Sequence, residues 1–136
     1  MVGRDDASRD ATRWMVGWAT HRRRGAAGWT GPLPSTHYSG YLPVGNTSGA
    51  PGFIHYWLIL SENDPENDPL LYWTNGGPGG SGIAAGLLTE MGQMHLNEAS
   101  LDNETEGVPQ LFYNPYRRPR RNLPVADNPR HGISTS

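Results

Sequence analysis

Hydrophobic and polar side chains are distributed so that the first half of the chain predicts two paired strands. Residues 37–44 alternate between apolar and polar positions, which is typical of a partly exposed antiparallel strand. Residues 53–60 are almost continuously apolar, which indicates a strand that is buried on both faces. Residues 45–52 lie between these segments and predict the loop of a hairpin.

A strand, a glycine-rich loop and a helix are predicted next, in that order. Residues 70–74 form a short apolar run, which we expect to pair with residues 53–60 as the central strand. Residues 75–80 form the loop, and residues 83–91 have a helical pattern that follows Ser81, an ordinary N-cap residue. The loop is therefore expected at the carboxyl end of the strand, where open α/β sheets bind ligands.

A polar segment, residues 62–69, connects the second strand to this unit and contains Glu-Asn-Asp-Pro twice. Asp and Asn close to Pro are typical of successive turns, so we expect a solvated connection. The segment lacks the central glycine and the final bidentate acid of a calcium-binding loop. No metal site is predicted here.

Every residue except Pro78 in the segment 76–80 is glycine. Without Cβ atoms, backbone N–H groups can approach an anion, and the N-terminus of the following helix adds partial positive charge. A phosphate P-loop does not fit because the chain contains no lysine, and Pro78 breaks a dinucleotide-binding pattern. Two interpretations of the loop stay open: an anion cradle, and a turn without chemistry.

Composition limits the classes of protein that fit. The chain has 136 residues, with 18 glycines, 12 prolines and no cysteine. Its glycine and proline content is below that of disordered chains, so part of it is expected to fold. The absence of cysteine excludes disulfides, a cysteine nucleophile and cysteine-bound metals. The formal net charge of -2 gives no reason to expect nucleic acid or a membrane surface as a partner.

Both ends of the chain depart from a globular pattern. Residues 1–27 predict a disordered or wrongly joined tail, and their run His-Arg-Arg-Arg at 21–24 is a thin signal for polyanion binding or nuclear localisation. No apolar stretch is long enough for a signal-peptide core or a membrane span. Residues 117–136 begin with a second arginine cluster and predict a degraded or truncated end.

Candidate nucleophiles and bases are few. Neither Ser81 nor any other serine lies in a Gly-x-Ser-x-Gly elbow, and no histidine is placed by a motif to activate one. His55 lies in the apolar strand without a second histidine at metal-ligand spacing, so it is predicted to be structural. The sequence therefore identifies no catalytic triad.

Four segments carry a resemblance to a known family. In chain order they are GWTGPLPSTHYSGYLPVG, FIHYWLILSENDPENDPLLYWTNGGPGGSG, GLLTEMG and LFYNPY. The motif Asn-Gly-Gly-Pro-Gly after an apolar strand is highly specific. On these motifs the chain resembles the serine carboxypeptidases, the family of carboxypeptidase Y and cathepsin A. The resemblance covers residues 28–116 and implies a partial serine carboxypeptidase domain.

The resemblance implies the N-terminal part of an α/β-hydrolase fold, with an antiparallel hairpin, a central strand, a glycine loop and a helix. Family domains are roughly three times longer than this chain, so the fold is expected to be incomplete. The family usually has Cys-Ser-Ser where this chain has Gly80-Ser81-Gly82, and one residue is added before the helix segment 86–90.

The resemblance also implies roles for four residues. Gly77 would donate an oxyanion-hole N–H group. Asn75 and the backbone of Gly76 would bind the free C-terminal carboxylate of the substrate. Glu90 would support them through a shared proton, which requires a raised carboxyl pKa and an acidic working pH.

The implied activity is that of a serine-type carboxypeptidase, which hydrolyses the C-terminal bond of a peptide or protein without a cofactor. Because no triad is identified, this chain alone is predicted to be inactive. Two alternatives stay open: a non-catalytic binding module derived from the family, and a family acyltransferase. The family implies the secretory route, with a vacuolar, lysosomal or extracellular destination, and the sequons at Asn46 and Asn103 are glycosylation candidates. The oligomeric state is not predicted.

Overall fold

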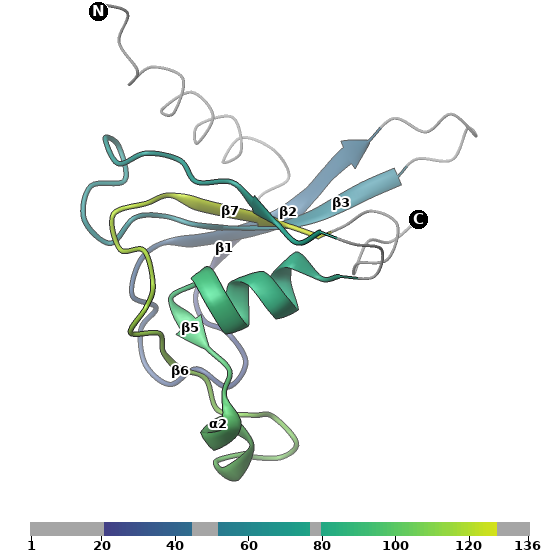
Figure 1. Ribbon diagram of the computed structural model, residues 1–136, viewed down its shortest axis with the longest axis vertical. Helices are drawn as coiled ribbons and strands as arrows, with labels where there is room; N and C mark the ends of the chain where they lie inside the picture. Colours follow the sequence, from purple (N-terminus) through teal and green to yellow (C-terminus); the bar gives the residue numbers. More distant parts are fainter. Residues whose placement is uncertain (1–20, 45–51, 77–79, 128–136) are drawn as a thin grey trace, which may run out of the picture.

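The computed structural model describes residues 21–44, 52–76 and 80–127. A five-stranded sheet in the order β1-β2-β3-β7-β4 forms one layer, and a helix, η1, lies across one of its faces (Figure 1). A smaller sheet of β5 and β6 and a short helix, α2, extend away from the main sheet. In chain order the elements are β1 (His21–Arg23), β2 (His37–Val44), β3 (Gly52–Ile59), β4 (Trp73–Thr74), η1 (Gly82–Met91), β5 (Met94–His95), α2 (Glu98–Asp102), β6 (Phe112–Tyr113) and β7 (Leu123–Ala126).

The predicted pairing of the two strands is confirmed, and residues 45–51 of the predicted loop between them lie outside the described residues. β2 and β3 pair antiparallel along their whole length, from His37 opposite Ile59 to Val44 opposite Gly52. The prediction that the second strand is buried on both faces is confirmed for its C-terminal half. Tyr56 and Leu58 are fully buried in one hydrophobic cluster, and the alternate residue Ile59 belongs to another. Period-two alternation places these clusters on opposite faces of the sheet.

The predicted pairing of residues 70–74 with residues 53–60 is wrong. β4 contains only Trp73 and Thr74, and it pairs parallel with β7. β7 in turn pairs antiparallel with β3 and so occupies the position expected for residues 70–74. All four residues of β7, Leu123–Ala126, are buried, which fits a strand in the interior of the sheet better than one at its edge.

The parallel pairing of β4 and β7 needs a crossover connection, which η1 begins. Ile83 and Leu87 of η1 pack against Ile59 of β3 and against Leu123 and Val125 of β7. A mixed sheet with a helical crossover is compatible with part of an α/β fold. This arrangement places the start of η1 beside the carboxyl ends of β4 and β7.

The predicted helix over residues 83–91 is confirmed, with one additional residue at its start. The Ser81 hydroxyl accepts a hydrogen bond from the N–H of Ala84 at 3.1 Å, as expected of an N-cap. The helix is wound as a π-helix, and at its end the N–H of Gly92 donates to the carbonyl of Leu87.

The turns predicted for residues 62–69 are confirmed, and one carboxylate organises them. Asp68 accepts hydrogen bonds from the Ser61 hydroxyl and from the N–H of Asp64. The Ser61 hydroxyl bond is the main reason that the pKa of Asp68 lies below its ordinary value. The buried Asn122, next to β7, donates to the carbonyls of Pro65 and Asp68, which ties the segment to the sheet.

Two segments contain structure that the sequence did not predict. α2 lies within residues 95–110, which look polar and irregular, and it is stabilised by a capping box between Asn97 and Ser100. β1 lies within the predicted tail 1–27, of which the structure describes residues 21–27, and it pairs with β2 from His37 to Ser39. Among the described residues, no helix has the length and apolar character needed to cross a bilayer.

Candidate carboxylate-recognition site

The glycine loop begins at the carboxyl end of β4, as the sequence predicts. The described residues continue from Gly80, before η1. Of the predicted site residues, Asn75, Gly76 and Glu90 are described. Gly77, the predicted oxyanion donor, lies outside the described residues. The same holds for the sequon residue Asn46, whereas Asn103 is exposed at the end of α2.

The side chain of Asn75 is held by its neighbour on the strand. The indole Nε1 of Trp73 donates a hydrogen bond to Asn75 Oδ1 at 2.9 Å. Because this bond uses the amide oxygen, it sets the orientation of the amide and leaves the two N–H donors of Nδ2 for another acceptor. Within the described residues Nδ2 donates no hydrogen bond. A carboxylate, which only accepts hydrogen bonds when ionised, matches this donor group.

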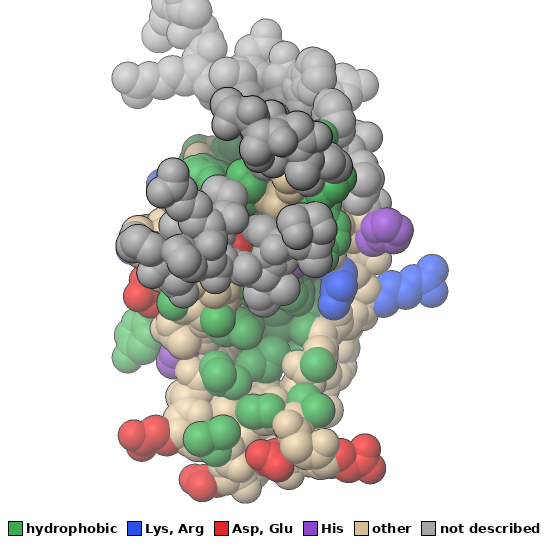
Figure 2. All heavy atoms as spheres, turned by 90° about the vertical axis from the view of Figure 1, so that its right-hand side faces the viewer, with side chains coloured by type: hydrophobic (Ala, Val, Ile, Leu, Met, Phe, Trp, Pro, Cys, Tyr) green, Lys and Arg blue, Asp and Glu red, His purple; other side chains and the backbone are tan. Residues whose placement is uncertain are grey.

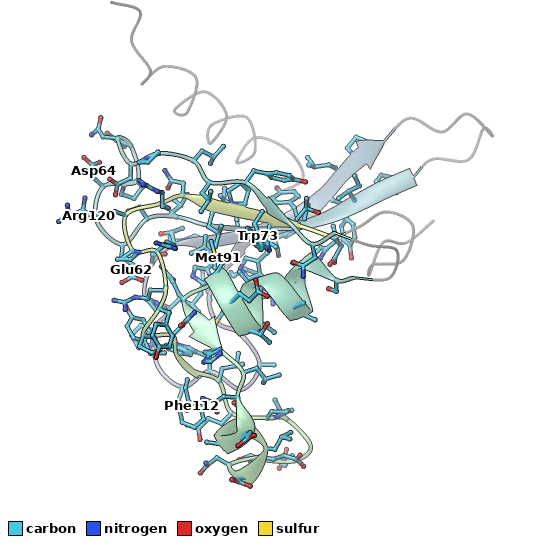
Figure 3. All side chains as sticks on the ribbon, in the orientation of Figure 1. Glu62, Asp64, Trp73, Met91, Phe112 and Arg120 are labelled. Atoms are coloured by element: carbon cyan, nitrogen blue, oxygen red, sulfur yellow. The ribbon has the colours of Figure 1, made fainter. Side chains whose placement is uncertain are left out.

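Trp73 is a site residue that the sequence analysis missed. Its side chain lies between the sheet and η1, packed against the core cluster (Figure 3). Residues two positions apart on a strand share a face, so the spacing of Trp73 and Asn75 was a usable signal. The indole therefore has two functions: it fills the core and it fixes the amide of Asn75.

Gly86 of η1 is required by the same arrangement. A Cβ atom at Gly86 would lie 2.4 Å from Trp73 Nε1 and 2.7 Å from Asn75 Oδ1. Both distances are shorter than a real side chain permits, so the helix can approach the Trp73–Asn75 pair only with glycine here. This role of Gly86 is not evident from the sequence alone.

Gly76 lies beyond the last β4–β7 pair and is exposed. Its N–H donates no hydrogen bond within the described residues, and no atom lies within 4 Å of a Cβ built on it. Gly76 thus lies outside the described sheet pairing, whereas the same prediction for the Gly77 N–H falls outside the described residues. Gly76 and the Nδ2 group of Asn75 give adjacent donors at the end of β4.

Glu90 is exposed on the last turn of η1. Within the described part of the chain its carboxylate makes no hydrogen bond or ion pair, with Asn75 and Gly76 or with any other residue. Its backbone carbonyl accepts a hydrogen bond from Asn114 Nδ2 at 3.0 Å, and the same amide donates to the carbonyl of Gly92 at 2.8 Å. The buried Asn114 thus fixes the helix end that carries Glu90.

Comparison with known proteins shows to which protein family the chain is related. The sequence profile described as "Serine carboxypeptidase" matches residues 28–118. The chain belongs to the serine carboxypeptidase family. The matched region contains Trp73, Asn75, Gly86 and Glu90, so the site described above lies inside the family domain.

Individual relatives agree with this assignment. The chain is 38% identical over 92 residues to serine carboxypeptidase 1 of Hordeum vulgare, covering 68% of this chain and 17% of the relative. It is 43% identical over 79 residues to the lysosomal protective protein of Mus musculus, covering 58% and 14%. It is 46% identical over 61 residues to carboxypeptidase Y of Komagataella phaffii, covering 45% and 11%. The chain thus spans less than a fifth of the length of these relatives.

A buried carboxylate anchors the far end of the glycine loop in this serine carboxypeptidase segment. Asp127 follows β7 and accepts hydrogen bonds from Ser81 Oγ at 2.7 Å and from the N–H of Ile83 at 3.4 Å. Its second oxygen lies 3.4 Å from His55 Nδ1. The place of Asp127 in the site is not evident from the sequence alone.

Ser81, His55 and Asp127 do not form a catalytic triad. In a triad the histidine lies between the serine and the acid, because it takes the serine proton. Here Asp127 lies between the other two and accepts from both. The arrangement therefore supports the predicted structural roles of Ser81 and His55.

Gly82 is required where the start of η1 meets β7. A Cβ atom at Gly82 would lie 2.2 Å from the carbonyl oxygen of Ala126, the last residue of β7. The start of η1 can therefore lie directly on the end of β7 only with glycine at this position.

Among the described residues, no group of three or more histidines, aspartates and glutamates is placed to hold a metal ion.

Proposed function

We propose that this chain forms the carboxylate-recognition and oxyanion part of a serine-type carboxypeptidase, an enzyme that removes C-terminal residues from peptides or proteins. One observation carries the proposal. Trp73 holds the oxygen of Asn75, so that the amide donors of Asn75 and the N–H of Gly76 are available together at the carboxyl end of β4. A free C-terminal carboxylate is the substrate group that adjacent neutral donors recognise.

In the proposed mechanism each donor has a separate task. Asn75 Nδ2 and the Gly76 N–H bind the substrate carboxylate and so place the last peptide bond next to the loop. The Gly77 N–H donates to the oxyanion that forms when a serine hydroxyl attacks that bond. The serine, with its histidine and acid, belongs to the remainder of the family domain. The Gly77 N–H acts mainly in the transition state, where negative charge develops on the carbonyl oxygen.

Glu90 is proposed to share a proton with the substrate carboxylate or with a second acid. Two carboxyl groups in contact cannot both be ionised, so the pair retains a proton and functions best at acidic pH. Glu90 is exposed in this chain, and this role requires a further segment to cover it. The bonds from Asn114 to the carbonyls of Glu90 and Gly92 hold the end of η1 in place for that contact.

The expected setting follows from the relatives. One relative is named lysosomal protective protein, and we propose a similar secretory route for the parent protein of this chain, ending in a vacuole, a lysosome or outside the cell.

Asn103 is exposed and is therefore accessible for glycosylation within its Asn-Glu-Thr sequon. Its side chain donates to the carbonyl of Ala99, a weak local contact that a glycan can replace.

The decisive test of catalysis is the transcript downstream of residue 136. A continuation with a Gly-Glu-Ser-Tyr type of elbow, followed by Asp and His, supports the enzyme. A natural stop after Ser136 contradicts it and favours a non-catalytic binding module. If the elbow is present, assays with peptide and hydroxyl acceptors then separate hydrolysis from acyl transfer.

A second test uses the chain as it is. Purified protein is expected to release no C-terminal residue from a peptide, because loss of the nucleophile costs orders of magnitude in rate even when an oxyanion hole is present. Release that a serine-directed inhibitor abolishes would contradict the assignment of the nucleophile to another part of the domain.

A further inference from the structure

A cavity of about 510 Å³ lies at the edge of the sheet opposite to the glycine loop. β1 forms this edge and β4 forms the other, so the cavity and the carboxylate-recognition site are separate. The cavity is bounded by β1 and by the loop that leads into β2. Its lining residues are Arg22, Arg23, Arg24, Pro32, Leu33, Ser35 and Thr36.

The positive charge of this arginine cavity is not neutralised within the described residues. Arg22, Arg23 and Arg24 are exposed, and none forms an ion pair in the described part of the chain. On the face that Figure 2 shows, acidic side chains gather around α2 and arginines stand out from one flank. A concave surface with one sign of charge concentrates ions of the other sign.

The walls of the cavity are held by hydrogen bonds. The indole of Trp29 donates to the carbonyl of Pro32 at 3.1 Å, and the carbonyl of Thr36 accepts from the N–H of Leu60 at 3.0 Å. Ser35 Oγ donates to the carbonyl of Leu60 at 2.6 Å. These bonds fix the loop before a ligand arrives, which lowers the entropic cost of binding.

Arg23 is fixed as well. Its guanidinium carbon lies 5.1 Å from the centre of the Trp57 ring, a cation–π contact. The hydroxyl of Thr36 makes no hydrogen bond within the described residues and can donate to a ligand. Three arginines, one of them with a fixed guanidinium, and a threonine with a hydroxyl donor therefore line the cavity.

We propose that the arginine cavity binds a phosphate or sulfate group carried by a small organic molecule. The planar fork of arginine donates two parallel hydrogen bonds to such an oxyanion, and several arginines match its multiple charge. The volume is in the range of small-molecule sites and exceeds that of a bare anion, so it accommodates an organic portion against Pro32 and Leu33. This proposal is independent of the carboxypeptidase activity.

The buried His37 lies close enough to Arg23 to report on anion binding in the cavity. Arg23 pairs with His37 across β1 and β2. His37 Nδ1 accepts a hydrogen bond from Trp57 Nε1 at 3.3 Å, and Nε2 lies 2.7 Å from Gln93 Oε1. Burial lowers the pKa of His37, the charge of Arg23 lowers it further, and Glu62 and the Gln93 bond oppose the decrease. An anion bound at Arg23 offsets that charge and should raise the pKa of His37.

The test is a titration of the full chain, followed by NMR and calorimetry at constant ionic strength. Inorganic phosphate, inorganic sulfate and phenyl phosphate are the probes, and chloride is the reference anion. We expect saturable binding of all three probes, with phenyl phosphate the tightest, and a rise in the pKa of His37 on saturation. Equal binding of phenyl phosphate and inorganic phosphate would overturn the organic portion of the proposal.

Two double variants separate a site from general charge. Arg22→Gln with Arg24→Gln should weaken phosphate binding by about tenfold or more, because it removes charge-assisted hydrogen bonds. Arg118→Gln with Arg121→Gln removes the same charge at exposed positions outside the cavity and should change binding by less than about twofold. Equal weakening by both double variants, or the absence of saturation, overturns the proposal.

A single variant, Thr36→Val, tests the proposal even if the double variant Arg22→Gln with Arg24→Gln does not fold. Thr36→Val keeps every charge and should weaken phosphate binding roughly threefold to tenfold through loss of one hydroxyl donor. All variants are compared at an unchanged circular dichroism spectrum. Wild-type phosphate affinity in Thr36→Val, or saturation that leaves the His37 resonances unmoved, would place the anion elsewhere and contradict the assignment.

Discussion

The indole Nε1 of Trp73 donates a hydrogen bond to Asn75 Oδ1 across 2.9 Å, at the point where β4 ends and the glycine loop begins. This bond links the hydrophobic core to the candidate recognition site, because the same indole packs against the core cluster under η1. The orientation of the Asn75 amide is thus determined by a part-buried contact and not by the loop alone.

Trp73→Phe should weaken binding of a peptide carboxylate more than it weakens the fold. The variant keeps an aromatic ring in the core but releases the Asn75 amide, so we expect about tenfold weaker peptide binding. The free energy of unfolding should fall by about 1 kcal/mol, the usual contribution of one hydrogen bond. Urea denaturation and a peptide titration measure the two effects.

Trp29→Phe is the matched control, since the indole of Trp29 also donates one hydrogen bond, to the carbonyl of Pro32. It should leave peptide binding unchanged. Equal losses of peptide affinity in the two variants would show that the Trp73–Asn75 bond has no specific role.

Gly86→Ala should destabilise the protein by about 1–3 kcal/mol, because the added methyl group overlaps the side chains of Trp73 and Asn75. Gly76→Ala adds the same methyl group where no atom of the described residues lies within 4 Å, and it should leave the free energy of unfolding almost unchanged. Thermal and urea unfolding of both variants are the measurements. A stable Gly86→Ala protein would mean that η1 does not approach β4 as described.

Asp127→Asn should destabilise the protein by about 1–3 kcal/mol, since the buried carboxylate accepts from Ser81 Oγ and from the N–H of Ile83. Asp102→Asn changes an exposed carboxylate and is the control. A double-mutant cycle with Ser81→Ala should give a coupling energy of about 0.5–3 kcal/mol. Additive effects of the two substitutions would exclude the Ser81–Asp127 interaction as a determinant of stability.

His37 should make stability depend on pH between neutral and mildly acidic conditions. Burial lowers its pKa below the ordinary value of 6.5, so the unfolded chain binds a proton more readily than the folded chain. The contribution of neutral His37 is complete above pH 6.5 and is lost as the pH falls from 6.5 toward the folded-state pKa. Protonation would also place an N–H on Nδ1 opposite the Trp57 N–H donor.

Urea denaturation at pH 8.0 and pH 5.0 measures this dependence. His37→Gln should reduce the difference in unfolding free energy between the two pH values, whereas His21→Gln, at an exposed position, should retain it. The pKa of Asp68 is lowered as well, but its contribution is lost only at more acidic pH, near and below 3.8. An unchanged pH dependence in His37→Gln would contradict the burial of a neutral imidazole.

The sequence predicted those elements that depend on local pattern. The β2–β3 hairpin follows from the alternation in residues 37–44 and the apolar run after it, and η1 follows from a helical pattern with Ser81 as its cap. The position of the glycine loop at a strand end follows from the same segments. Each of these features depends on neighbouring residues along the chain.

Features that depend on distant segments were not predicted. β7 pairs parallel with β4 across a long connection. Its four residues, Leu-Pro-Val-Ala, are too few to show the alternating pattern that predicts a strand. The roles of Gly86 and Asp127 appear only when a helix and a strand meet. Periodicity identifies elements, whereas the partner of a strand depends on tertiary packing.

Binding of a free C-terminal carboxylate at the end of β4 is the central claim, and one NMR titration tests it most directly. The chain is titrated with an N-acetylated dipeptide as the free acid and as the C-terminal amide, with Asn75→Ala as a control. We predict that the free acid shifts the Asn75 side-chain amide and the Gly76 N–H in a saturable manner, whereas the amide does not, and that Asn75→Ala abolishes the effect. Equal shifts with both peptides, or shifts confined to residues away from the end of β4, would contradict the account.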